Sequence, residues 1–148
     1  KAEMWVAVAE HVAGLLTAAW AKALEGSKEP VERLKALTGA QLDQITANPA
    51  MPMLLFSREL NVENAALREA FRDRLVTLHG LLMRDVIEGQ QDETLCSDVA
   101  AGDVAVLLTS LIQGVAIRWS LGARDFALRE EGLRLLAVQL RLLGVREG

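Results

Sequence analysis

The sequence predicts an all-α fold. The helix-forming residues Ala, Leu, Glu and Arg dominate the composition, and apolar residues recur three or four positions apart between turn signals. Alternation of apolar and polar residues, which is typical of strands, is nowhere sustained, and the chain contains no Tyr. The 148 residues suffice for one domain with a sizeable core, and about half of them (51%) are apolar.

Turn signals divide the chain into six predicted helices. The first runs from Ala2 to about Glu25 and ends at Gly26-Ser27. The second begins around Pro30, which suits a first helical turn because its missing N–H needs no partner there, and it ends at Asn48-Pro49. The other four cover 51–56, 61–88, 100–121 and 125–143.

Five residues carry the boundary signals of the later helices. Asn61 and Asp125 have side chains that accept hydrogen bonds from a first helical turn, so we expect them to cap the fourth and sixth helices. Gly89, Gly122 and Gly144 follow the fourth, fifth and sixth helices, and we expect each glycine to mark the C-terminal stop.

The last two predicted helices are apolar on more than one side. In the fifth, one stripe includes Val104, Leu108 and Trp119, and the opposite side is not polar. That opposite side contains Ser110 and Gly114, whose small side chains permit close approach of another helix. In the sixth, leucines recur nearly all the way round. A helix that is apolar on several sides must be covered on several sides.

We therefore expect an isologous homodimer in which these two helices pair with their symmetry mates as a four-helix interface. The alternative is that both are central helices of a monomer. The candidate interface residues are Val106, Ser110, Gly114, Ile117, Leu121, Leu136 and Leu140.

Composition and motifs argue against catalysis, metal binding and a membrane span. The uncharged stretch 104–117 is shorter than the roughly 18–20 residues that cross a bilayer. The net charge of −4 does not favour nucleic acid, and the single Cys96 supports no disulfide framework, which is typical of the cytoplasm. His11 and His79 are isolated, and phosphate-binding and nucleophile motifs are missing. We expect neither an enzyme nor a metal or other cofactor.

A ligand pocket among the first five helices is the second functional expectation. His79 lies inside the apolar face of the fourth helix, where it is either a satisfied core residue or the orienting polar group of a pocket. Met-rich walls suit an adaptable apolar pocket, although ordinary core filling explains them equally well. The candidate ligand-binding residues are Leu16, Gln41, Met53, Phe56, Phe71, His79, Met83 and Gln113.

Five segments resemble the regulatory domain of TetR/AcrR-family transcriptional regulators. Residues 1–4 (Lys-Ala-Glu-Met) resemble the last step of that family's helix-turn-helix head. Residues 55–60 resemble its short middle helix, 86–90 the end of its long seventh helix, 111–119 its eighth and 133–143 its ninth. Each segment is weak alone, but their order and spacing match along essentially the whole chain.

The resemblance implies a six-helix ligand-sensing and dimerisation domain over residues 1–148, with 1–4 as the remnant of a junction with a missing DNA-binding head. It implies a cytoplasmic repressor whose partners are a second copy, an apolar or amphipathic effector and, through the head, operator DNA. Lys1 matches a position that often approaches a DNA phosphate in this family. A helical interaction or scaffold module without a small-molecule site is the alternative function.

Overall fold

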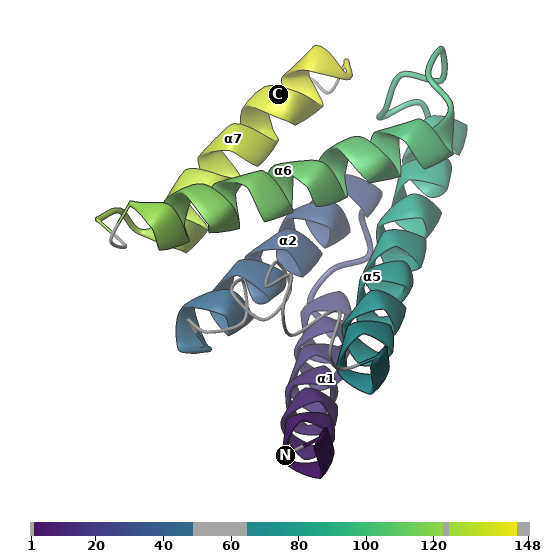
Figure 1. The fold of residues 1–148 in the computed structure, drawn as a ribbon. Coiled ribbons are helices and arrows are strands. Elements are labelled where there is room, and N and C mark those ends of the chain that lie inside the picture. Colours follow the sequence, from purple (N-terminus) through teal and green to yellow (C-terminus); the bar gives the residue numbers. More distant parts are fainter. Residues whose placement is uncertain (1, 49–64, 123–124, 145–148) are drawn as a thin grey trace.

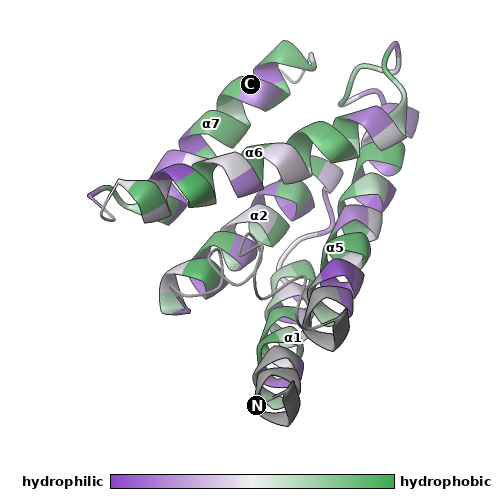
Figure 2. Cartoon of the chain, viewed as in Figure 1, coloured by the Kyte–Doolittle hydropathy of each residue, from purple (hydrophilic) through white to green (hydrophobic). Residues whose placement is uncertain are grey.

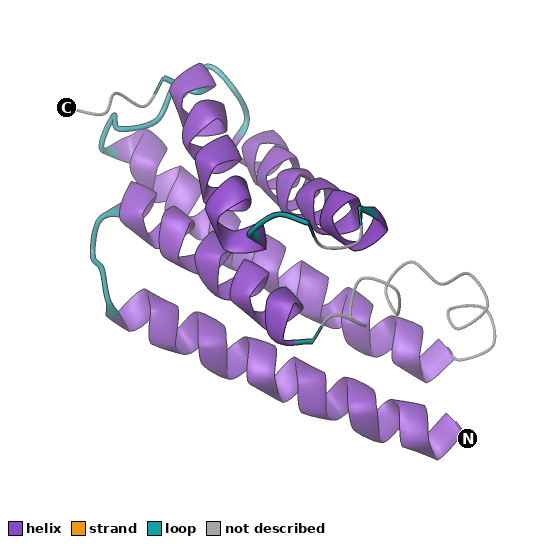
Figure 3. Ribbon diagram, turned by 90° about the vertical axis from the view of Figure 1, so that its left-hand side faces the viewer, coloured by secondary structure: helices purple, strands orange, loops and turns teal. Residues whose placement is uncertain are grey.

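In the computed structural model, described for residues 2–48, 65–122 and 125–144, the chain folds into α-helices joined by turns and loops, and these residues form no strand. The all-α prediction is therefore confirmed (Figure 3). The helices are α1 (Ala2–Glu25), α2 (Pro30–Ala47), α5 (Ala65–Gln91), α6 (Ala101–Leu121) and α7 (Leu128–Leu142).

Several predicted boundaries are confirmed. Helix α1 ends at Glu25, and α2 begins with Pro30 at its first position. Gly122 caps the C-terminus of α6. Gly144 directly follows Leu143, the C-cap residue of α7. Its φ of +91° is a left-handed conformation that glycine adopts without a steric penalty. The predicted helix at 51–56 and the predicted cap Asn61 lie outside the described residues.

Two boundary predictions are wrong. Helix α5 continues through Gly89 to Gln91, and Gly89 is instead buried under the loop that follows, where an added Cβ would lie 2.7 Å from Leu95 Cδ1. Asp125 does not cap α7, because the N-cap residue is Ala127 and no side chain bonds to that end of the helix. Both positions carry residues that are common at helix ends, but tertiary packing and loop length determine where the helices end.

Helix α2 is the centre of the domain. It contacts α1, α5, α6 and α7, while α1 also packs along α5, and α6 packs against both α5 and α7. In Figure 1, α1 and α5 descend together and α6 crosses in front of α2. Helices α6 and α7 lie close together where α6 ends and α7 begins, and they diverge from there (Figure 1).

The core fills the space between these helices. Its largest fully buried side chains are Trp20, Leu34, Leu37, Leu42, Leu78, Leu82, Leu108, Leu136, Leu140 and Val86. They come from all the described helices, so each helix has one side fixed in the interior.

Candidate functional site

The outer side of α6 is exposed and largely apolar. Its inner stripe is buried against the core: Val104, Ala105, Leu108, Ile112, Val115, Ala116 and Trp119. On the opposite side, Val106 is 52% and Leu121 is 82% exposed, and Ser110 and Gly114 are exposed between them. Ile117, on the same side, is half-buried. Figure 2 shows hydrophobic residues along much of the visible side of α6.

Charge is confined to the two ends of α6. Asp103 lies in its first turn and Arg118 in its last, with no charged residue between them. The guanidinium of Arg118 donates a hydrogen bond to Glu131 of α7 at 3.2 Å, and it lies 5.3 Å from the centroid of the Phe126 ring. These contacts join the C-terminal end of α6 to the N-terminal end of α7, so the outer sides of the two helices are adjacent there.

The structure corrects the predicted interface on α7. Leu136 and Leu140 are each only 1% exposed, because this side of α7 packs on α2, where Gly132 lies against Leu42. They belong to the core of the protomer itself and are not accessible to a second copy. The exposed apolar side chains of α7 are instead Val138 (45%) and Leu142 (79%).

The helical wheel of α7 does not identify which side faces inward, because leucines occur nearly all round the helix. One signal in the sequence did mark that side. Gly132 is spaced at four-residue intervals from Leu128, Leu136 and Leu140, and a buried glycine in such a stripe allows two helices to approach closely. Because the inward side of α7 was not identified from the leucines, sequence reasoning missed Val138 and Leu142 as surface residues.

The predicted ligand-binding residues whose side chains the structure describes come from α1, α2, α5 and α6. Leu16 and Gln41 are buried in the core, while His79, Met83 and Gln113 are half-buried on α5 and α6. Met53 and Phe56 lie outside the described residues, and the side chain of Phe71 is not among those described. Lys1, the predicted phosphate contact, also lies outside them.

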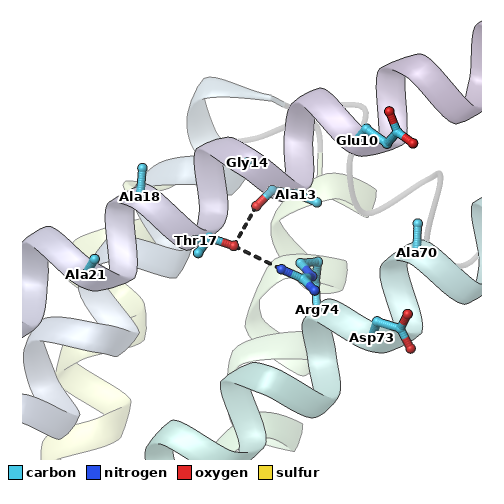
Figure 4. Close-up of a pocket in the computed structure, with 9 residues that line it drawn as sticks. All are labelled: Glu10, Ala13, Gly14, Thr17, Ala18, Ala21, Ala70, Asp73 and Arg74. Carbon is cyan, nitrogen blue, oxygen red and sulfur yellow. Dashed lines mark hydrogen bonds between the residues drawn. The ribbon is translucent and has the colours of Figure 1, made fainter.

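A groove lies elsewhere, on the outer side of α1 where it runs beside α5 (Figure 4). It is open to solvent, with a volume of about 640 Å³. The residues that line it are Glu10, Ala13, Gly14, Thr17, Ala18, Ala21, Ala70, Asp73 and Arg74. Arg74 Nη1 donates to Thr17 Oγ1 at 3.1 Å, and that hydroxyl donates to the Ala13 carbonyl at 2.9 Å. None of the predicted ligand-binding residues lines this groove.

The composition of α6 also fits a helix that spans a membrane. Of the helices searched in the described part of the chain, Ala101–Leu121 is long and apolar enough to cross a membrane. Length and composition alone carry little weight, because a core helix of a soluble protein passes the same test. The contacts of α6 with α2, α5 and α7 account for the apolar residues on its inner side. Its outer side has no such partner among the residues that the structure describes.

Comparison with known proteins gives this chain no relative: no family model, no curated protein and no solved structure matches it.

Proposed function

We propose that this chain is the dimerising regulatory domain of a transcriptional repressor of the TetR/AcrR type. In this proposal, two copies pair through the outer sides of α6 and α7 in the cytoplasm. An apolar or amphipathic effector controls operator binding by a helix-turn-helix segment joined before α1. The observation that carries the dimer is the exposed, uncharged outer side of α6 between Asp103 and Arg118.

Antiparallel pairing of α6 with itself suits this surface. The small residues Ser110 and Gly114 are near the middle of the helix, where they permit the two backbones to approach. A two-fold axis near them brings the N-terminal half of each helix onto the C-terminal half of the other. Asp103 of each copy then lies toward the end that carries Arg118 in the other, so the end charges are complementary.

The area that a stable dimer needs explains why α7 takes part. At 1.5 Å per residue, the 21 residues of α6 form a side about 31 Å long, and a strip about 10 Å wide buries roughly 300 Å² per copy. Two such strips give about 600 Å², below the roughly 1,000 Å² expected of a specific interface. The outer side of α7, where Val138 and Leu142 are exposed, would supply the additional area in this proposal.

Regulation in this proposal depends on the packing of α1. This helix contacts both α2 and α5, and those two helices contact α6. An effector that favours one arrangement of α1 would change the spacing of DNA-binding segments in the dimer. A coupling free energy of about 1–3 kcal/mol is enough to change DNA affinity 5–150-fold.

A helical interaction module without a small-molecule site is the second candidate. It is favoured by one observation, that Leu16 and Gln41, two of the predicted ligand-binding residues, are buried in the core. The two candidates share the α6–α7 surface and differ in effector binding.

Sedimentation of surface variants tests the dimer. The double variant Val106→Glu/Leu121→Glu changes two exposed positions on α6. It should convert the dimer to a folded monomer, because the two copies together would bury four carboxylates at the interface. The matched control is Val76→Glu, at a 63% exposed site on α5. Circular dichroism should show the same helicity in all three proteins. A wild-type chain that sediments as a monomer at high micromolar concentration would contradict the proposal.

Effector binding separates the two candidates. A thermal-shift screen of apolar and amphipathic compounds should give hits that raise the melting temperature with concentration. The proposed effector role of His79 predicts weaker shifts in His79→Ala. If no compound stabilises the dimer, the interaction module is the better description. If the full gene product fails to bind symmetric DNA, the regulator is excluded.

A further inference from the structure

A buried carboxylate joins α2 to α5. The Asp85 side chain on α5 is fully buried (0% exposed), and its nearest cation is Arg33 in the first turns of α2. Arg33 Nε lies 3.1 Å from Asp85 Oδ1, but neither the carboxylate oxygens nor this Nε makes a hydrogen bond of good geometry. A buried ion pair without directional hydrogen bonds recovers little of its desolvation cost.

A second carboxylate competes for the same arginine. Arg33 Nη1 lies 3.8 Å from Oε2 of Glu88, which is on α5 one turn after Asp85 and is 47% exposed. Arg33 itself is 19% exposed, so its guanidinium is at the boundary between core and solvent. Its inner partner, Asp85, is therefore shielded from solvent, and its outer partner, Glu88, is hydrated.

The charges that act on Asp85 come from two helices. Arg33 faces it from α2, and Arg84 and Glu88 act on it from α5, with Arg84 Nε at 4.0 Å from Oδ1. Helices α1 and α6 also pack on α5, but their described residues bring no charge that acts on this carboxyl. Burial raises the pKa of Asp85 above its ordinary value, and the attraction of Arg33 and Arg84 only partly offsets this.

We propose that Arg33 exchanges partners in acid: protonation of Asp85 frees the guanidinium from the inner carboxyl and transfers it to Glu88. In the neutral-pH state the ionised pair holds the first turns of α2 against α5 at a cost in desolvation. In the acid state a neutral carboxyl remains in the core and the ion pair moves to the surface. Because α1 packs on both α2 and α5, the exchange alters the surface that supports α1.

The linkage has a definite sign. A carboxyl whose pKa is raised in the folded protein binds its proton more tightly there than in the unfolded chain, so it lowers stability at neutral pH. That loss disappears as the pH falls through the folded pKa. Asp85→Asn, which mimics the protonated form, should therefore melt at a higher temperature than wild type at pH 7. The difference should shrink as the pH falls toward about 4.

Four proteins and two readouts test the exchange. Melting temperatures from pH 7 to about 4 should converge for wild type and Asp85→Asn, whereas the exposed control Asp98→Asn should show no such convergence with wild type. By NMR, the Arg33 Nε–Hε resonance should shift with pH in wild type and in Glu88→Gln, by a smaller amount in the latter because the outer partner is neutral. In Asp85→Asn it should hold one position from pH 7 to about 5. Parallel melting curves, or an Arg33 resonance that does not respond to pH in wild type, would overturn the proposal.

Discussion

The indole Nε1 of Trp20 on α1 donates a hydrogen bond of 2.9 Å to the side-chain oxygen of Gln41 on α2. Both residues are almost fully buried. This bond satisfies the polar atom of a large core side chain and fixes the position of the amide at the same time. Gln41 is one of the predicted ligand-binding residues, and its amide oxygen is instead engaged inside the core.

Gln41→Leu should destabilise the domain by about 1–3 kcal/mol, because the Trp20 N–H would be left buried without an acceptor. Trp20→Phe removes the donor and creates a small void, so it should also destabilise. The double variant should lose less than the sum of the two single variants, since no orphaned donor remains. Urea unfolding followed by circular dichroism measures all three. Strict additivity would show that the bond contributes nothing.

Gly132→Ala and Gly80→Ala should change stability in opposite directions. A Cβ at Gly132 would overlap the fully buried Leu42, so we expect a net loss of about 1–2 kcal/mol once the gain in helix propensity is counted. Gly80 lies on the exposed side of α5 with nothing within 4 Å of an added Cβ, so alanine there should gain about 0.5–1 kcal/mol. Denaturant midpoints give the comparison, and equal effects at both sites would contradict the close approach of α7 to α2.

Glu93→Gly should stabilise the chain slightly. Glu93 has φ +66° in the turn after α5, a left-handed conformation that costs a residue with a side chain roughly 1–2 kcal/mol. Glycine removes that strain but adds about 0.5–1 kcal/mol of unfolded-state entropy, which leaves a net gain of at most about 1.5 kcal/mol. Thermal unfolding should show a higher midpoint for Glu93→Gly than for the control Glu93→Ala, which retains the strain at the same position.

The sequence predicted local features well and tertiary contacts less well. Pro30 and Gly144 act through the backbone of their own turn, so their roles were predictable without knowledge of the fold. Gly89 looks the same in sequence as Gly144, but its role depends on Leu95 packing over it after the chain has turned back. Asp85 is similar, because only the fold places Arg33 beside it and buries it.

The outer sides of α6 and α7 show the same difference between local features, which the sequence predicted, and tertiary contacts, which it did not. Periodicity identified α6 and α7 as helices with apolar residues on more than one side, and the structure places Val106, Ser110, Gly114 and Leu121 at the exposed outer side of α6. Which leucines of α7 face inward depended on where α2 lies. No pattern within α7 alone carried that information except Gly132, whose partner Leu42 is distant in sequence.

Leu136→Ala and Leu142→Ala should separate the stability of the protomer from that of the dimer. Leu136 is 1% exposed, so its truncation removes core contacts and should cost about 2–5 kcal/mol at every protein concentration. Leu142 is 79% exposed in the single chain and should contribute little there. In the proposed dimer it becomes buried, so its truncation should weaken association.

Melting temperature as a function of protein concentration distinguishes the two effects, because a dimer gains stability as concentration rises and a monomer does not. Leu136→Ala should lower the melting temperature uniformly and keep its slope against concentration. Leu142→Ala should match wild type at low concentration and fall below it at high concentration, where association contributes most. If Leu142→Ala follows wild type at all concentrations, α7 lies outside the interface, and the area argument then requires another surface beside α6.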